Sequence, residues 1–216
     1  SVAVDYTDNT DVGTASASAT YVGDANHTSD TDSATFEITS ASSVTTITCP
    51  ASVGFTGSAQ TPCTATVIGS GGLNQSVTVD YTNNTDAGTA NASATFAGDA
   101  NHAASSDTEI FAIDAASSAT VVSCPTNVTY TGAAQTPCTV SVTGAGGLNL
   151  APTPDYTDNT NVGTASASYS YVGDANHVGS SDSETFTIDA ASTEVAITCP
   201  ASVEFTGSTQ TPCTAT

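Results

Sequence analysis

The chain has 216 residues, including 21 acidic side chains, three histidines and no lysine or arginine, and its formal net charge is −21. Without one fixed cation, the chain lacks the basic surface that nucleic-acid binding requires, and docking on an anionic membrane is disfavoured for the same reason. No apolar run is long enough to insert into a bilayer, and the missing lysines and arginines predict a fold without salt bridges.

A unit of 75 residues recurs along the chain, since Cys49, Cys124 and Cys199 keep this spacing. The same step separates Cys63, Cys138 and Cys213, the Asp-Tyr pairs at 5–6, 80–81 and 155–156, and the Asp-Ala-Asn-His runs at 24–27, 99–102 and 174–177. A fixed period with matching turns indicates tandem copies of one small module. The predicted domains are the C-terminal part of a repeat at 1–41, complete repeats at 42–116 and 117–191, and the N-terminal strands of a further repeat at 192–216.

The partial repeats at 1–41 and 192–216 together supply one module, apart from the loop that matches 67–75. Two explanations fit this pattern: a longer continuous array, which we favour, or subunits that complete one another by donating strands. Both predict that the partners are copies of the chain itself or adjacent repeats in a linear fibre.

Apolar and polar residues alternate along the complete repeat 42–116, with the period of β-strands. The inward sets of the first three strands are Thr45, Ile47 and Cys49; Val53 and Phe55; and Cys63, Ala65 and Val67. The later sets are Val77, Val79 and Tyr81; Ala90, Ala92, Ala94 and Phe96; and Phe111 with Ile113, before a short Ala/Ser linker. Pro50, Gly57 and the clusters 69–72, 83–88 and 98–101 mark the turns.

Six or seven short strands per unit without helical periodicity predict an all-β fold of tandem immunoglobulin-like Greek-key β-sandwiches in a linear array. Substitutions between the copies support the assigned faces. Pro152 and Pro154 replace Val77 and Val79, and a sheet tolerates proline only in an edge strand. A single β-solenoid is disfavoured, because its rungs repeat at much shorter periods.

The segment Phe55-Thr-Gly-Ser-Ala-Gln-Thr-Pro62 and its counterpart at 130–137 resemble the Tyr-x-Gly-x-x-x-x-Pro entry of bacterial Ig-like repeats (MBG-type, or bacterial Ig-like group 3). The segment 88–101 is similar to the Gly-x-Tyr-x-Val-x-Ala-x-Tyr-x-Gly-Asp-x-Asn-Tyr end of the same modules. The resemblance covers the whole repeat and implies tandem domains of large secreted adhesins and surface fibres, without catalysis. The chain departs from the family at its cysteine pairs and at His27, His102 and His177, where the family usually has tyrosine.

The even number and fixed spacing of the cysteines predict disulfides formed in an oxidising, extracellular setting. We favour bonds within each repeat, namely Cys49–Cys63, Cys124–Cys138 and Cys199–Cys213, over bonds between successive repeats or between chains. Closing so short a loop contributes about 3 kcal/mol. Zinc is disfavoured, because two thiols and a distant histidine do not supply four ligands.

Side chains with oxygen atoms recur three residues apart, and the three sets are Asp5, Asp8 and Asp11; Asp80, Asn83 and Asp86; and Asp155, Asp158 and Asn161. Such clusters could ligate calcium, but Asp and Asn are also the residues that form turns, and we favour the turn. For the histidines we favour a half-buried ring over a metal ligand or a pH switch. Sequons at Asn26, Asn74, Asn83, Asn91 and Asn127 permit glycosylation.

Two functions remain as hypotheses. The first is a structural segment of an extracellular fibre or cell-surface stalk that provides length, stiffness and protease resistance. The alternative is a ligand-binding adhesin module that acts through its loops or edge strands. The loops at 82–88 and 98–102 are among the best-preserved parts of the repeat, which favours the structural function. No enzyme and no cofactor are expected, because no catalytic residue set stands apart from the repeat.

Overall fold

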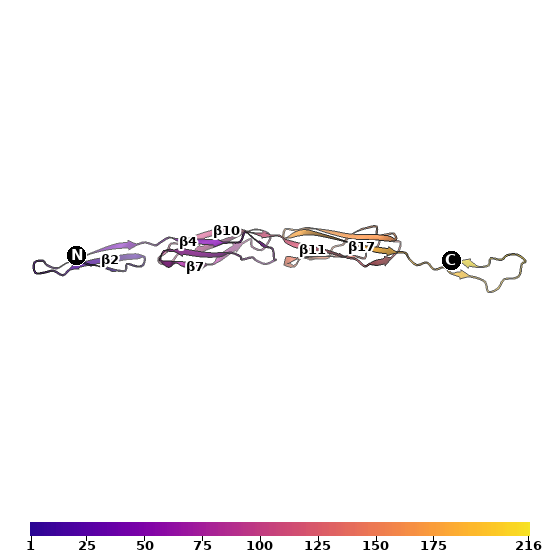
Figure 1. The fold of residues 1–216 in the computed structure, drawn as a ribbon, viewed down its shortest axis with the longest axis horizontal. Helices are drawn as coiled ribbons and strands as arrows, with labels where there is room; N and C mark the ends of the chain where they lie inside the picture. The colour runs from indigo at the N-terminus through magenta and orange to yellow at the C-terminus, as the bar shows by residue number, and fades with distance from the viewer. The chain divides into compact units, whose positions relative to one another are not determined.

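The computed structural model describes residues 1–216, and its regular elements are β-strands apart from two single turns of 3-10 helix, Ser70–Gly72 and Ala145–Gly147. Figure 1 shows strands and connecting loops along the whole chain. The predicted all-β class is therefore confirmed. No helix has the length and apolar character needed to span a bilayer.

The chain forms two compact units. The first contains Ser1–Ser117 together with two short segments from further along the chain, Gly144–Gly147 and Gly173–Val178. The second contains Ser118–Thr143, Leu148–Val172 and Gly179–Thr216.

The first unit begins with a three-stranded antiparallel sheet of β1 (Val4–Thr7), β2 (Gly13–Tyr21) and β3 (Asp30–Ile38), in that order. This sheet has little core of its own. Ala15 is its only fully buried apolar residue, whereas Tyr6 and Phe36 stay about half exposed at 54% and 43% and touch edge to face.

Residues 42–116 form two further sheets. One is antiparallel and contains β4 (Ser43–Thr48), β6 (Thr64–Gly69) and β7 (Asn74–Val77) in the order β4-β6-β7. The other has the order β5-β10-β9-β8, from β5 (Ser52–Gly54), β8 (Val79–Thr82), β9 (Gly88–Phe96) and β10 (Ser105–Asp114). In it β5 runs parallel to β10, while β9 is antiparallel to both of its neighbours.

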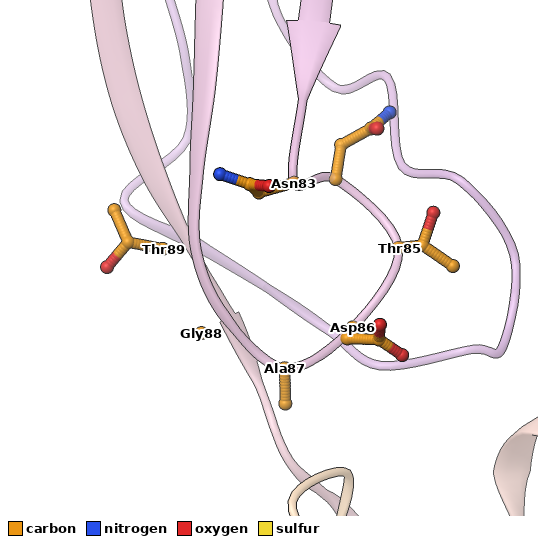
Figure 2. Close-up of a pocket in the computed structure, with 7 residues that line it drawn as sticks. Asn83, Thr85, Asp86, Ala87, Gly88 and Thr89 are labelled. Carbon is orange, nitrogen blue, oxygen red and sulfur yellow. The ribbon is translucent and has the colours of Figure 1, made fainter.

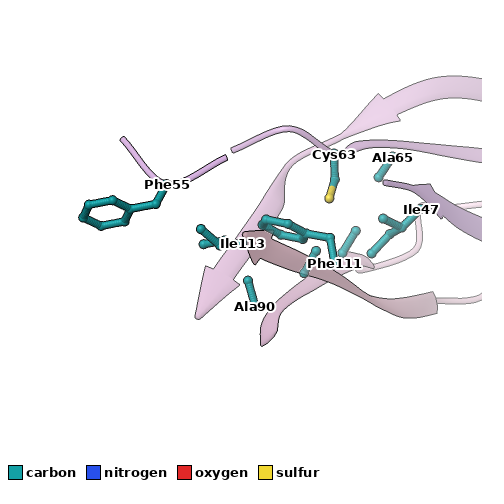
Figure 3. Close-up of a cluster of buried hydrophobic side chains, with 9 residues drawn as sticks. Ile47, Phe55, Cys63, Ala65, Ala90, Phe111 and Ile113 are labelled. Atoms are coloured by element: carbon teal, nitrogen blue, oxygen red, sulfur yellow. The ribbon is translucent and has the colours of Figure 1, made fainter. Parts of the chain in front are cut away.

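Both sheets contribute side chains to one core, as in a β-sandwich. Ile47 and Ala65 come from the three-stranded sheet, and Phe111 and Ile113 come from β10. Figure 3 shows Phe111 among these side chains, with the ring of Phe55 farther out, beyond Ile113. The three small alanines of β9 are also buried in this core: Ala90, Ala92 and Ala94. The predicted inward faces of these strands are confirmed.

The edge-strand prediction is also confirmed. β7 and β8 form the edges of their two sheets, and the chain passes from one sheet to the other at Thr78. The prolines that occupy the equivalent positions in the next copy, Pro152 and Pro154, lie outside the strands. They therefore remove no ladder hydrogen bond.

Residues 116–189 repeat this arrangement with β11 (Ala116–Ser123), β12 (Asn127–Thr129), β13 (Thr139–Gly144), β14 (Asn149–Leu150), β15 (Asp155–Thr157), β16 (Gly163–Gly173) and β17 (His177–Asp189). The start of β11 pairs in parallel with the start of β17, which joins all seven strands in one sheet. Within it, the orders β14-β13-β11 and β12-β17-β16-β15 match those of the two sheets at 42–116. The core of residues 116–189 gathers Val122, Cys138, Val140, Val142, Ala165, Ala167, Phe186 and Ile188. The exposed hairpin of β18 (Ile197–Thr198) and β19 (Thr214–Ala215) follows.

Two strands are longer than their sequence pattern predicts. β10 begins at Ser105 rather than near Phe111, and β11 begins inside the expected Ala/Ser linker. The early part of β10 turns Ser105 and Asp107 toward β4, where they form hydrogen bonds with Thr45 and the Ile47 backbone. Polar inward residues leave no hydrophobic alternation, so periodicity misses this stretch.

Candidate functional site

The turn between β8 and β9 connects two strands of one sheet, and Figure 2 shows it as an open ring with Asp86 and Ala87 at its tip. Residues 83–89 line a cavity of about 320 Å³. Asn83 adopts a left-handed conformation with φ of 55°, as do Asp8 and Asp158 at 56° and 55°. Asn and Asp tolerate this conformation better than most residues, and each is the middle member of its three-residue oxygen set.

The members of each oxygen set occupy different places in and beside the turn. Asp80 lies in β8, Asn83 makes the left-handed turn, and Asp86 accepts a hydrogen bond from Asn176. No group of three or more histidine, cysteine, aspartate or glutamate side chains is arranged to hold a metal ion. The conformation of the middle residue accounts for the pattern as turn formation.

Three disulfides close loops within the repeats: Cys49–Cys63, Cys124–Cys138 and Cys199–Cys213. The loop after Cys49 is also tied to the turn at 83–89. The Gln60 amide donates to the Asn84 carbonyl at 2.7 Å, and the Asn84 side chain donates to the Gln60 carbonyl at 2.8 Å. Gln135 and Asn159 repeat this pair in the second unit, at 2.7 Å for both bonds.

The tyrosine of the repeated Asp-Tyr pair anchors the second cysteine. The Tyr81 hydroxyl accepts from the Cys63 amide at 2.9 Å and donates to the Cys63 carbonyl at 3.1 Å. Its ring packs edge-on against Phe111, with centroids 6.2 Å apart. Tyr156 makes the same contacts with Cys138 and Phe186. One hydroxyl thus satisfies both backbone groups of a half-cystine.

Each Asp-Ala-Asn-His run forms a turn around its aspartate. Asp99 Oδ1 accepts from the backbone amides of Asn101 and His102, both at 2.8 Å, and lies 2.8 Å from the His102 ring Nδ1. The other ring nitrogen, Nε2, faces the Ser70 carbonyl at 2.8 Å. His177 lies in the same way between Asp174 and the Ala145 carbonyl.

Both nitrogens of His102 therefore face groups that only accept hydrogen bonds. A neutral imidazole donates from one nitrogen, so this position favours the doubly protonated cation. The Ser70 carbonyl, followed by Asp99, raises the pKa of His102. The Ala145 carbonyl raises the pKa of His177, against an opposing effect of burial. The backbone amide of Asn101 and the His102 ring lower the pKa of Asp99.

These contacts correct two sequence predictions. The prediction that the fold lacks salt bridges is wrong, because each histidine ring lies against an aspartate carboxylate. The three pairs are Asp24–His27, Asp99–His102 and Asp174–His177. The predicted half-buried ring fits His102 but is wrong for the buried His177 and the exposed His27. The side chains of His102 and His177 are 12% and 7% exposed, whereas His27 is 69% exposed.

The polar atoms of the Asp-Ala-Asn-His turns at 99–102 and 174–177 are already hydrogen-bonded within the protein. His102 and His177 direct both ring nitrogens at protein acceptors, so in the doubly protonated form neither ring has a lone pair for a metal ion. Sequence reasoning named these positions without finding the partners of Tyr81, Asn84, Asn101 and His102. The recurrence of each residue in every copy was the available signal.

A scan against models of known protein families found no match, and a search of curated proteins found none either.

Proposed function

We propose that the chain is a structural segment of an extracellular fibre or cell-surface stalk. In this proposal, residues 42–116 and 117–191 are tandem immunoglobulin-like Greek-key sandwiches related to the bacterial Ig-like repeats that the sequence resembles. The repeats supply length, stiffness and protease resistance rather than catalysis. Their partners are copies of the same repeat.

The observation that carries this proposal is the identity of the supporting contacts in the two complete copies. Both disulfides join cysteines with Cα atoms 4.3 Å apart, and both tyrosine hydroxyls bond the backbone of the second cysteine. The Asn–Gln and Asp–His–carbonyl contacts also recur. A binding or catalytic copy would differ from its neighbour in its loops, and these loops are built alike.

The first and last strands of each copy contact one another directly. The chain enters through β4 or β11 and leaves through β10 or β17. Thr45 bonds Ser105 and the Ile47 amide donates to Asp107, and Thr120 with Ser180 and Val122 with Asp182 repeat these two contacts. A load applied to the two ends of a copy therefore acts on these hydrogen bonds as well as on the core.

The disulfides support the extracellular location, because such bonds persist in oxidising compartments. They also limit extension after a repeat unfolds. Each bond keeps a 14-residue separation closed, which hides roughly 45 Å of extended chain at about 3.4 Å per residue.

The test is single-molecule stretching of the whole chain, held at its two ends. We expect two abrupt unfolding events of similar force, one for each complete repeat. A reductant should lengthen each event by about 45 Å, with the oxidised chain as the control. Smooth extension without abrupt events would contradict a load-bearing function. Specific capture of a surface ligand, lost on substitution of the loop 83–88, would support the adhesin alternative.

A further inference from the structure

The first unit contains a side-chain contact that joins two copies of the repeat. Asn101, in the Asp-Ala-Asn-His turn of one copy, reaches the turn of the copy before it. Its Oδ1 accepts from the Val12 amide at 2.9 Å, and its Nδ2 donates to Asp11 Oδ1, also at 2.9 Å. We call this two-bond contact the Asn clamp.

The Asn clamp occurs a second time in the same unit, which includes Gly173–Val178. Asn176 Oδ1 accepts from the Ala87 amide at 2.7 Å, and Asn176 Nδ2 donates to Asp86 Oδ1 at 3.1 Å. Asp86 and Ala87 are the tip residues of the turn in Figure 2. The two clamps are 75 residues apart and use the same atoms.

An asparagine suits this position chemically. It offers one acceptor and one donor side by side, matching a backbone N–H next to a side-chain oxygen. An aspartate would place a second carboxylate against Asp11 or Asp86. The clamp is therefore selective for the residue type as well as for its position.

The turn holds its asparagine in place before any contact is made. Asp99 accepts from the Asn101 amide, and the chain before the turn is hydrogen-bonded to it as well. The Ala41 amide donates to the Asn101 carbonyl at 2.9 Å, and the Ala103 amide donates to the Ala41 carbonyl at 2.8 Å. In the second case the Ala116 amide donates to the Asn176 carbonyl at 2.9 Å.

A close backbone contact accompanies the second clamp within the first unit. The ring of Phe55 meets the ring of His177 edge to face at 5.4 Å between centroids. Gly57 and Gly146 approach so closely that a Cβ on Gly57 would overlap the Gly146 Cα. Both glycines also have positive φ values, of 82° and 64°. Both the lack of space and the positive φ values therefore exclude any residue other than glycine from this contact.

We infer that the Asp-Ala-Asn-His turn is the surface by which one copy of the repeat recognises the copy before it, with its asparagine as the residue that selects the partner. The partner it fits is another copy of this repeat, presenting an Asp or Asn side chain followed by a free amide and a glycine. Asn161, Val162 and Gly163 form such a segment, and Asn26 is the matching asparagine of the first copy. This inference rests on the proposed structural function, and it identifies the contact that connects successive repeats.

The inference is tested by amide hydrogen exchange of the full chain, followed by NMR. After correction for intrinsic rates, the Val12 and Ala87 amides should exchange more slowly than the equivalent Val162 amide, which no clamp covers. Asn101→Asp should speed exchange at Val12 by about fivefold or more, since a charge-repelled pair replaces the hydrogen bond. Exchange at the core residue Ile113 should not change.

Asn26→Asp is the matched control, because it makes the same substitution in the same turn and should leave Val12 and Ala87 unaffected. Asn101→Ala, which removes the clamp without adding charge, provides the second variant. The inference is overturned if Val12 and Ala87 exchange as fast as Val162, or if neither Asn101 variant changes Val12. Two abrupt unfolding events under force, together with an unprotected Val12 amide, would refute the Asn clamp and support the structural function. Smooth extension with a protected Val12 amide would refute the structural function and support the Asn clamp.

Discussion

The nearly buried ring of His102 lies between the carboxylate of Asp99 and the carbonyl of Ser70, and both contacts favour its charged form. In a chain without lysine or arginine, such a ring is the only kind of side-chain cation available. A histidine whose pKa is higher in the folded than in the unfolded chain stabilises the fold fully below the unfolded value. That contribution disappears as the pH rises through the folded value.

The first prediction is that the unfolding temperature falls as the pH rises above about 6.5, the ordinary histidine value. The raised pKa values of His102 and His177 set this direction. On the acid side, the lowered pKa of Asp99 means that its contribution is lost only as the pH falls below its ordinary value of 3.8. Thermal melts between pH 4.5 and 9 would measure this dependence.

A paired variant isolates the two rings. His102→Gln with His177→Gln should flatten the fall in melting temperature above pH 6.5. His27→Gln should leave it in place, since the His27 ring is 69% exposed. A wild-type chain that is equally stable at pH 5.5 and 8.5 would contradict the cationic assignment.

The second prediction concerns the hydroxyl of Tyr81. Tyr81→Phe keeps the ring against Phe111 but leaves the Cys63 amide and carbonyl without their partner. The free energy of unfolding should fall by about 1–3 kcal/mol, the cost of unsatisfied buried groups. Denaturant titration would measure it. Tyr130→Phe is the matched control with no expected effect, because the other complete copy already has Phe55 there.

At the scale of single elements, sequence predicts the strands whose inward residues are apolar. Ile47, Ala65 and Ala90 belong to alternating runs, and all three are buried where the pattern places them. The pattern fails at the start of β10, where Ser105 and Asp107 face β4 instead. Hydrogen bonds replaced hydrophobic contacts there, and periodicity detects only the latter.

The contacts of the candidate site are harder to predict than the strands. Asn84 meets Gln60, 24 residues away, and Asn101 meets Asp11, 90 residues away. Such pairs depend on which loops the strand order brings together, and the alternation of a single strand does not encode this. Recurrence in every copy could identify these residues as important, but it could not pair them.

The third prediction concerns the edge strand β4. The Ile47 amide, at the outer edge of its sheet, donates to Asp107 Oδ2 at 2.9 Å, and the Val122 amide donates to Asp182 in the same way at 2.8 Å. Asp107→Ala should lower the free energy of unfolding by about 1–3 kcal/mol, because it leaves a buried amide unpaired. It should also promote association, since an uncovered edge can pair with another chain.

Denaturant titration and sedimentation would measure these two effects. Glu109→Ala is the matched control on the same strand, because it removes a carboxylate from an exposed position. Equal stability of the Asp107 and Glu109 variants would show that the carboxylate does not protect the edge.

At the scale of the whole molecule, the net charge opposes the fold through self-repulsion. The chain has a formal net charge of −21, and its three histidines can neutralise only a small part of it. Disulfides and apolar cores must therefore stabilise the repeats against self-repulsion. Added salt reduces that repulsion by screening, without any specific binding.

The last prediction separates this screening from calcium binding at the Asp and Asn turns. Raising the ionic strength from 0.01 to 0.15 M shortens the screening length from about 30 to about 8 Å, so the unfolding temperature should rise with sodium chloride. At equal ionic strength, magnesium chloride and calcium chloride should stabilise the fold equally. The reason is that Asn83 forms the left-handed turn and Asp86 accepts the hydrogen bond of the Asn clamp, so neither side chain serves as a cation ligand. Thermal melts in the three salts, repeated with a chelator, would measure the difference. A rise specific to calcium that is lost in Asp86→Asn would contradict the turn interpretation, since magnesium has the same charge and differs mainly in size and preferred ligand geometry.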